Sequence, residues 1–198
     1  TFVVRVLQPF HANLAKRQVK SPKIYVADSG LLHTLLGVPN LDTLRGHAKV
    51  RASFEGFALA TIVEHLHARP HECYYWATHS GAELDLLIER GGRRIGFEFK
   101  LGSAPSLTPS MRTAMVDLEL ERLWVVHAGK EVIKLAPSIT ALPLALVAFA
   151  AKDEAPRVAT AKGATDRVEM IATVHANKAA VKQVLGDDVN GYVYVVEV

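Results

Sequence analysis

The chain has 198 residues, of which 49% are hydrophobic and 22% are charged, and its mean hydropathy is +0.15. This composition supports one globular domain of about 140–150 residues with a sizeable core, followed by a tail. No apolar run approaches the ~18 residues of a membrane span, and the first ten residues, TFVVRVLQPF, lack the layout of a secretory signal. A single cysteine excludes a disulfide framework within the chain. We therefore expect a cytoplasmic protein with no membrane partner.

The net charge of +3 is unevenly distributed along the chain. Residues 1–51 contain eight Lys and Arg against two Asp and Glu, whereas residues 52–198 contain 15 against 18. The basic first part is a candidate surface for phosphate groups, and an ordinary solvated basic face is the alternative.

The first segment begins with Thr1 instead of Met, so we expect a fragment of a longer protein. It contains two strand-like runs, Phe2–Leu7 and Ile24–Val26, joined by a basic connection. Two strands that flank a basic loop are typical of the wing of a winged-helix unit, so residues 1–27 are interpreted as the remnant of such a wing. The candidate nucleic-acid contacts in this connection are Lys16, Arg17, Lys20 and Lys23.

Two helices are predicted next. Asp28 is placed as the N-cap of Ser29–Leu36, whose leucines form an apolar stripe that we expect to be packed, and Gly37 ends the helix. Ser53 is the expected N-cap of a longer helix, Phe54 to about His67. Glu55 would then lie in the first turn, where the helix dipole favours an acid, but it is also placed to reach the acids described below.

The stretch Gly81–Lys100 predicts a β-hairpin, because Gly91-Gly92 between two alternating runs can form a tight turn. It follows an aromatic strand at 73–76, in which Cys73 is interpreted as a buried structural thiol. A tight turn pairs Arg90 with Arg93, Glu89 with Arg94, Asp85 with Glu98, and Glu83 with Lys100. Alternation places six apolar side chains on one core-facing side: Leu84, Leu86, Ile88, Ile95, Phe97 and Phe99.

The predicted pair of Asp85 and Glu98 is unusual, because like charges directly opposite each other destabilise a sheet. At an effective dielectric near 20, two carboxylates about 5 Å apart repel by roughly 3 kcal/mol. A divalent cation would compensate for this repulsion, and Mg²⁺ is commonly held by one or two carboxylates. Lys100 lies on the same side of its strand as Glu98. A solvated hairpin whose two acids point apart into water is the alternative.

The absence of His-Glu-x-x-His or clustered Cys and His spacing excludes zinc.

The rest of the chain predicts a loop, a helix from Ser110 to about Leu118, a buried strand at Arg122–His127, another strand at 132–135 and a closing helix at 137–149. The order of elements indicates an α/β sandwich with a central mixed sheet over residues 28–149. Residues 150–165 have the composition of a linker, and residues 166–198 predict a small β-α-β-like tail to which we assign no role.

Three segments, KRQVKSPKIYVADSGLLHTLLG, ASFEGFALATIVEHL and YYWATHSGAELDLLIERGGRRIGFEFKLGSAP, together resemble domain of unknown function 4143 over roughly residues 1–146. In bacterial and archaeal proteins this domain usually follows an AAA+-type ATPase module, and it is grouped with the PD-(D/E)xK nuclease-like fold. The resemblance implies that Asp85, Glu98 and Lys100 occupy the core positions of that fold and Glu55 its helix acid. The sequence itself contains no G-x-x-x-x-G-K-[ST] phosphate loop, so the ATPase module is not part of it.

Two functions follow from these expectations. In the first, the domain is a metal-dependent DNA phosphodiesterase: Glu55, Asp85 and Glu98 hold Mg²⁺ or Mn²⁺, the Phe99 carbonyl completes the site, and Lys100 positions water and stabilises the phosphate. The basic segment would grip the DNA backbone without reading its sequence. In the second, the domain is a non-catalytic regulatory or docking module that binds DNA or protein for an upstream ATPase.

Overall fold

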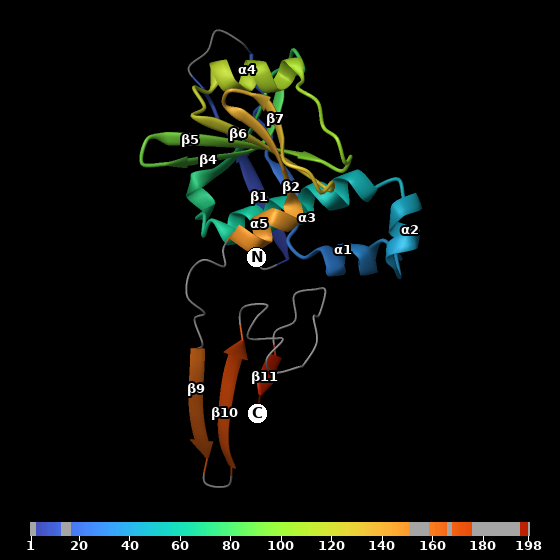
Figure 1. Ribbon diagram of the computed structural model, residues 1–198, viewed down its shortest axis with the longest axis vertical. Helices are drawn as coiled ribbons and strands as arrows, with labels where there is room; N and C mark the ends of the chain where they lie inside the picture. The colour runs from blue at the N-terminus through green and yellow to red at the C-terminus, as the bar shows by residue number, and fades with distance from the viewer. Residues whose placement is uncertain (1–2, 13–16, 151–158, 166–167, 176–194, 198) are drawn as a thin grey trace. The chain divides into compact units, whose positions relative to one another are not determined.

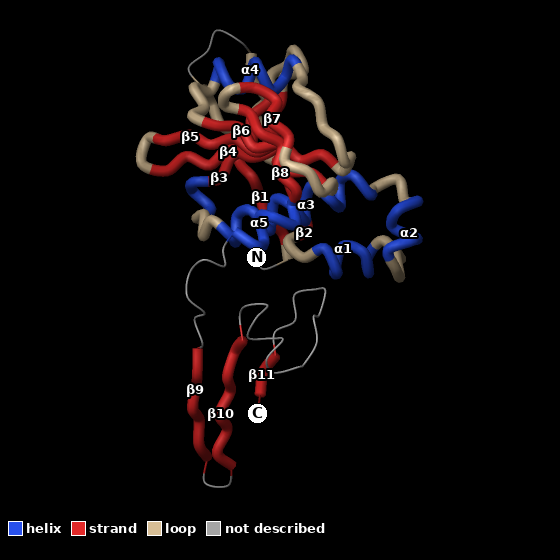
Figure 2. Tube along the Cα trace, in the orientation of Figure 1, coloured by secondary structure: helices blue, strands red, loops and turns tan. Residues whose placement is uncertain are grey.

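The computed structural model describes residues 3–12, 17–150, 159–165, 168–175 and 195–197. The chain divides into two units, Thr1–Ala148 and Phe149–Val198. In the first unit eight strands form one sheet with the order β2-β1-β3-β4-β5-β6-β8-β7 (Figure 2). Parallel pairs (β1 with β3, β5 with β6, β6 with β8) occur beside antiparallel ones, so the predicted mixed sheet is confirmed.

The strands of this sheet are β1 (Val4–Pro9), β2 (Lys23–Val26), β3 (Cys73–Ala77), β4 (Glu83–Arg90), β5 (Arg93–Lys100), β6 (Arg122–His127), β7 (Ile133–Ala136) and β8 (Ile139–Pro143). The helices are α1 (Ser29–Leu35), α2 (Leu41–Gly46), α3 (Val50–His65), α4 (Pro109–Asp117) and α5 (Leu144–Ala150), and a 3-10 turn η1 spans Pro70–Glu72. Among the described residues, no helix combines the length and apolar character needed to cross a bilayer.

Helices cover both faces of the sheet, with α4 on one face and α3 and α5 on the other (Figure 1). Each face therefore has its own hydrophobic core. The α3-side core is built on buried side chains of α3, α5 and the sheet: Leu7, Ala58, Leu59, Ile62, Val63, Cys73, Tyr75, Leu86, Ile88, Phe97, Phe99, Val126, Leu144 and Val147. The α4-side core contains Trp76, Leu84, Leu87, Met111, Ala114, Leu118, Leu120, Leu123, Val125, Ile139 and Ala141.

The central hairpin has the predicted turn, since Gly91 and Gly92 both have positive φ and Arg90 faces Arg93. The prediction of one shared apolar face is wrong for Leu84, which packs in the α4-side core while Leu86 packs in the α3-side core. The cause is a bulge: two residues of β3, from Tyr74 to Trp76, span three residues of β4, from Leu87 to Leu84. An extra residue in one strand reverses the facing of all positions beyond it. Asp85 lies within this irregularity.

The first two strands belong to the main sheet and not to a separate wing. β1 pairs antiparallel with β2, as predicted, but it also pairs in parallel with β3 through Gln8 and Pro9 opposite Tyr74 and Tyr75. Leu7 is buried in the α3-side core. The expected boundary at residue 27 is therefore absent, because the backbone of β1 completes its hydrogen bonds with the sheet that carries the hairpin.

The longer helix starts earlier than predicted. Its N-cap is Lys49 and its first residue Val50, so Ser53 lies inside the helix, where its hydroxyl contacts His33 Nε2 at 2.7 Å. Glu55 consequently lies in the second turn, beyond the strongest influence of the helix dipole, which weakens the structural explanation for an acid at this position.

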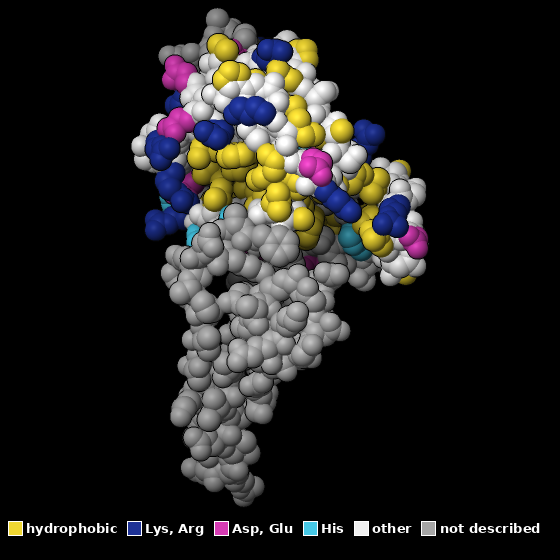
Figure 3. All heavy atoms as spheres, in the orientation of Figure 1, with side chains coloured by type: hydrophobic (Ala, Val, Ile, Leu, Met, Phe, Trp, Pro, Cys, Tyr) yellow, Lys and Arg dark blue, Asp and Glu magenta, His cyan; other side chains and the backbone are white. Residues whose placement is uncertain are grey.

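The short helix α1 has its predicted cap, because Asp28 accepts a hydrogen bond from Leu31 N and Gly37 has a φ of +66°. Its leucines are less buried than predicted: Leu31, Leu35 and Leu36 are 37%, 69% and 37% exposed. The helix packs chiefly against α3 and β2, which leaves much of its apolar stripe at the surface. Hydrophobic side chains are visible there, around α1 and α2, in Figure 3.

The predicted closing helix at 137–149 is wrong in its first half. Residues Ile139–Pro143 form β8, which lies between β6 and β7 and has Ile139 and Ala141 buried in the α4-side core. A short apolar run that is buried as a strand cannot be distinguished from a buried helix by periodicity alone. The helix begins only at Leu144.

The second unit contains a three-stranded antiparallel sheet with the order β11-β10-β9. Its strands are β9 (Ala159–Thr165), β10 (Val168–His175) and β11 (Val195–Glu197). β9 falls in the expected linker 150–165; its backbone pairs along its whole length with β10, which overrides its weak strand composition. The helix of the predicted β-α-β-like tail falls between β10 and β11, outside the described residues.

Gly96 provides a test of the α4-side core, because a Cβ atom at this position would lie 2.7 Å from Leu120 Cδ1 and 3.0 Å from Leu123 Cδ1. We expect Gly96→Ala to lower the free energy of unfolding by about 1–3 kcal/mol through overpacking, as measured by urea denaturation. Gly46→Ala is the matched control, since its Cβ would meet nothing within 4 Å. A Gly96→Ala protein as stable as the control variant would contradict this packing.

Candidate functional site

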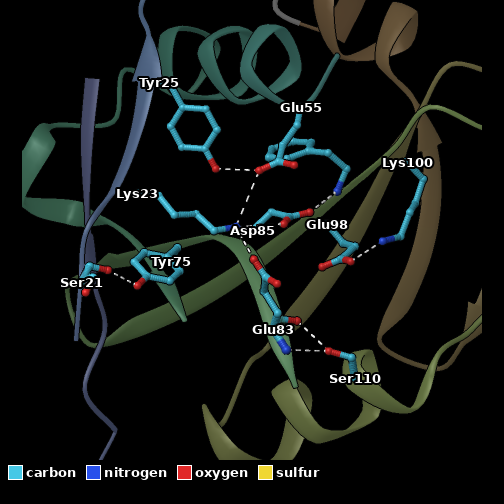
Figure 4. Close-up of polar contacts among 11 residues, drawn as sticks. Ser21, Lys23, Tyr25, Glu55, Tyr75, Glu83, Asp85, Glu98, Lys100 and Ser110 are labelled. Carbon is cyan, nitrogen blue, oxygen red and sulfur yellow. Dashed lines mark hydrogen bonds and ion pairs between the residues drawn. The ribbon is translucent and has the colours of Figure 1, made fainter. Parts of the chain in front are cut away.

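Acidic side chains gather at the end of the sheet where β4 begins and β5 ends. Glu83 and Asp85 come from β4, Glu98 from β5, and Glu55 from α3, which covers this end of the sheet (Figure 4). Two lysines, Lys23 of β2 and Lys100 of β5, lie among them. The fold thus brings together Glu55, Asp85, Glu98 and Lys100, which the sequence predicted as one site. It adds Glu83, and it adds Lys23, which the sequence had assigned to a nucleic-acid contact.

Asp85 is fixed by the backbone of the neighbouring strand. Its Oδ2 accepts a hydrogen bond of 2.9 Å from Phe99 N, and the residue is only 7% exposed. The regular pairing of β4 with β5 runs from Arg90–Arg93 to Leu86–Phe97. Beyond the end of this ladder, the side chain of Asp85 therefore accepts the hydrogen bond of a backbone N–H group of β5.

Glu98 is equally buried, at 7% exposure, but only half satisfied. Its Oε1 accepts a hydrogen bond of 2.6 Å from Lys100 Nζ, whereas its Oε2 is buried without a hydrogen-bond partner. A buried carboxylate oxygen without a donor is costly. The predicted pairing of Lys100 with Glu83 is wrong, because the ladder between β4 and β5 ends at Leu86 opposite Phe97, within the irregular part of β4.

Glu55 is oriented by a tyrosine of β2. Tyr25 Oη donates a hydrogen bond of 2.7 Å to Glu55 Oε1, which aims the carboxylate toward the β4 acids. Gly56, the next residue of α3, faces the Tyr25 ring, where a Cβ would make an ordinary van der Waals contact at 3.6 Å. Tyr25 is a site residue that sequence reasoning missed; its alternation with Lys23 on one strand is the only signal that could have indicated it.

Lys23 was predicted to contact nucleic acid, but the structure places its ammonium group among the carboxylates. Nζ pairs with Glu83 Oε1 and lies 3.6 Å from Asp85 Oδ1 and 3.7 Å from Glu55 Oε1. The group also lies 5.3 Å from the centre of the Tyr75 ring. The reason is the pairing of β2 with β1, which fixes Lys23 opposite Leu7 and turns its side chain toward the site.

The other predicted nucleic-acid contacts lie elsewhere. Arg17 and Lys20 are exposed, and the segment that carries them runs beside the end of β3, where Val19 N donates to Ala77 O. Lys16 lies outside the described residues. The basic segment is thus divided between an exposed part and Lys23, which belongs to the acidic site.

Burial and mutual repulsion shape the titration of the acids. The pKa of Asp85 is raised to about 7, first by burial and then by the nearby charges of Glu98 and Glu55, against the opposing effects of the Phe99 N–H and Lys23. Burial also raises the pKa of Glu98, although Lys100 opposes this. For Lys23, burial alone would lower the pKa, but the hydrogen bond to Glu83 and the surrounding acids raise it above its ordinary value.

The site opens into a cleft of about 730 Å³. Its acidic wall is formed by Glu55, Glu83, Asp85 and Glu98, and the loop after β5 forms much of the rest. Arg51 lines the cleft from the first turn of α3, and Lys100 lines it from β5. Anionic and cationic groups therefore face the same solvent-accessible space, which is large enough to admit part of a polymeric ligand.

The predicted metal ligands share this cleft without forming a closed ligand set. Within the described part of the chain, no group of three or more His, Cys, Asp or Glu side chains lies close enough together to hold a metal ion. Instead, Lys23 bridges Glu55 and Asp85, and Lys100 pairs with one carboxylate oxygen of Glu98.

The raised pKa of Asp85 predicts how stability depends on pH. Its folded pKa of about 7 lies above its ordinary value of 3.8, so the folded protein retains a proton that the unfolded chain loses. The unfavourable contribution of Asp85 therefore grows as pH rises through this window and is complete above it. We expect Asp85→Asn to raise the free energy of unfolding at pH 8 by about 1–2 kcal/mol, and by much less at pH 5.

Urea denaturation of metal-free protein at both pH values checks this expectation. Asp42→Asn is the control, because the Asp42 side chain is 90% exposed. A gain in stability that is the same at pH 5 and pH 8, or no gain at either, would show that Asp85 is not a strained buried carboxylate.

Comparison with known proteins gives two matches to domain models and two similar proteins, none of which carries an assigned activity. Residues 51–147 match the model of a domain of unknown function (DUF4143), and residues 1–42 match that of another domain of unknown function (DUF8612). Uncharacterized protein Rv2008c of Mycobacterium tuberculosis and uncharacterized protein Mb2031c of Mycobacterium bovis are each 48% identical to the chain over 141 residues. The match covers 71% of this chain and 32% of each relative, so the chain spans about a third of their length.

No solved structure shows significant similarity to the chain. The DUF4143 match includes α3 and the central hairpin, and therefore contains Glu55, Asp85, Glu98 and Lys100. The region from residue 51 to residue 147 thus resembles DUF4143, as the second and third sequence segments predicted. The first segment, which was also assigned to DUF4143, lies instead in the region that matches DUF8612.

Proposed function

We propose that this domain is a magnesium-dependent DNA phosphodiesterase of the PD-(D/E)xK nuclease-like type. The proposal is carried by one observation: two buried carboxylates, Asp85 and Glu98, lie side by side at the wall of an open cleft, and Glu98 Oε2 has no hydrogen-bond partner there. In the larger proteins of the family, we propose that the domain works as a module attached to an AAA+-type ATPase.

The donor set fits a hard divalent cation. Carboxylate and carbonyl oxygens are the ligands that Mg²⁺ and Mn²⁺ prefer, and the site contains carboxylates without a Cys or His among them. Asp85 and Glu98 would hold the ion, Glu55 would approach from α3, and the carbonyl of Phe99 would complete the set. The partnerless oxygen of Glu98 and the raised pKa of Asp85 are the signs of negative charge that lacks its counter-ion.

When bound, the ion supplies polarisation of a phosphate and a more acidic water. The chain supplies the rest. Lys100 places a positive charge 2.6 Å from Glu98 with 41% of its side chain still exposed, so its ammonium can meet a phosphate oxygen in the cleft and stabilise the charge that develops there. The Phe99 N–H holds the Asp85 carboxylate in one orientation.

A specific observation also favours the second function, a non-catalytic regulatory or docking module. The ammonium of Lys23 lies where a cation among Glu55, Glu83 and Asp85 is needed, so the acids are partly neutralised by the chain itself. An acid cluster with its own ammonium can be a purely structural network.

Plasmid nicking distinguishes the two functions. With Mg²⁺ or Mn²⁺, the parent protein should convert supercoiled plasmid to open circles, and Lys100→Ala should lower this rate by about 10²-fold or more, as expected for loss of a charge that stabilises the transition state. Lys134→Ala, on the opposite edge strand β7, is the control for loss of a lysine. Metal-independent nicking, or equal rates in both variants, would contradict the enzyme, and DNA binding without cleavage would support the docking module.

The exposed basic residues give a separate prediction about DNA binding. If Arg17 and Lys20 grip phosphates, the double variant Arg17→Ala/Lys20→Ala should bind duplex DNA more weakly, and the slope of log K against log salt should fall by about 2. Fluorescence anisotropy over a series of salt concentrations measures both quantities. Arg112→Ala, on α4, is the control for loss of an arginine, and an unchanged slope in the double variant would show that Arg17 and Lys20 do not contact the DNA.

A further inference from the structure

Lys23 is held in its position by several independent contacts. Its backbone is fixed in β2 opposite Leu7, and two residues earlier the carbonyl of Ser21 accepts a hydrogen bond from Tyr75 Oη. Tyr75 is 2% exposed, and its ring lies beneath the Lys23 ammonium. The lysine is therefore part of a built site and not a surface side chain that happens to lie near acids.

The ammonium of Lys23 has the surroundings of a cation site. Carboxylate oxygens of Glu55, Glu83 and Asp85 all lie within 4 Å of Nζ, and only 26% of the lysine side chain is exposed. With Glu98 and Lys100 included, four carboxylates face two ammonium groups, which leaves a formal charge of −2 when all are ionised. A divalent cation would neutralise this remainder.

A divalent cation and the Lys23 ammonium cannot both occupy these oxygens. Asp85 Oδ1 and Glu55 Oε1 contact Lys23 at 3.6 Å and 3.7 Å, and an ion bound to the same two carboxylates would lie close enough to the ammonium to repel it strongly. These two contacts of Lys23 Nζ are longer than its contact with Glu83 Oε1. The close partner of Lys23 is Glu83, which is 47% exposed and so offers the ammonium a position away from the buried pair.

The backbone of Glu83 is anchored for this role. Ser110 of α4 both donates to Glu83 O and accepts from Glu83 N, each at 2.8 Å. These two hydrogen bonds fix the backbone of Glu83 beside Lys23 independently of Asp85.

We propose that Lys23 is the resident counter-ion of this site and that a divalent cation displaces its ammonium from Asp85 and Glu55 toward Glu83. This inference rests on the proposed metal-dependent function and adds its regulation. Lys23 compensates part of the buried negative charge of the site before an ion binds, and it sets the concentration of metal at which the site is filled.

Isothermal titration calorimetry with Mn²⁺ and with Mg²⁺ tests the inference without a measurement of activity. Lys23→Met keeps the length of the side chain and removes its charge, so we expect it to bind the ion at least about tenfold more tightly than the parent, because the competing ammonium is gone. Lys23→Arg keeps the charge and should bind like the parent. Lys134→Met is the control for loss of a lysine charge, and Lys23→Gln replaces Lys23→Met if the latter does not fold.

Three outcomes are distinguishable. Tighter binding in Lys23→Met together with unchanged binding in Lys23→Arg supports the inference. Equal affinities in the parent and in Lys23→Met would overturn it while leaving the metal site in place. No binding by any of the variants would overturn the metal-dependent function itself, and the role of Lys23 with it.

Discussion

The structure depends at this end of the sheet on a conflict between burial and charge. The hairpin needs β4 and β5 to be covered on both faces, yet it carries Asp85 and Glu98 into the covered region, where each is only 7% exposed. Carboxylates taken out of water must be protonated, hydrogen-bonded or paired with cations. All three responses are present: the pKa of Asp85 rises, Phe99 N donates to it, and Lys23 and Lys100 bring ammonium groups into the cluster.

The incomplete part of this compensation is what connects the fold to a function. Glu98 Oε2 remains without a partner, and the cluster as a whole keeps more negative than positive groups. A protein that needed only stability would be served as well by apolar side chains at these positions. The cleft is open beside the acids, so a cation has access to the excess negative charge. Arg51 and Lys100 also line this cleft, so an anionic polymer there would meet positive charge.

Much of the site could be predicted from local sequence, because a Gly-Gly turn and strict alternation determine which residues of a hairpin lie opposite each other. That reasoning placed Asp85, Glu98 and Lys100 at one end of the hairpin. It failed at Leu84 and at the Glu83–Lys100 pair, because the bulge against β3 and the early end of the β4–β5 ladder depend on strands outside the hairpin. The register of one hairpin contains no information about them.

The role of Lys23 could not be predicted from the sequence for the same reason. In sequence it belongs to a basic run that resembles a phosphate-binding surface, and only the pairing of β2 with β1, and of β1 with β3, brings it to the acids. Lys23 and Tyr25 lie in the region that matches DUF8612, whereas the acids lie in the region that matches DUF4143. The site is thus completed by residues from two regions that match different domain models and share one sheet.

A crystal structure of the protein soaked in Mn²⁺ tests the central claim most directly, because the anomalous signal locates the ion independently of any assumption about its ligands. The account predicts a peak bound by Asp85 and Glu98, with the ammonium of Lys23 moved away from Asp85 and toward Glu83. An empty site at high Mn²⁺ concentration, or a Lys23 still bridging Glu55 and Asp85 beside a bound ion, would contradict it.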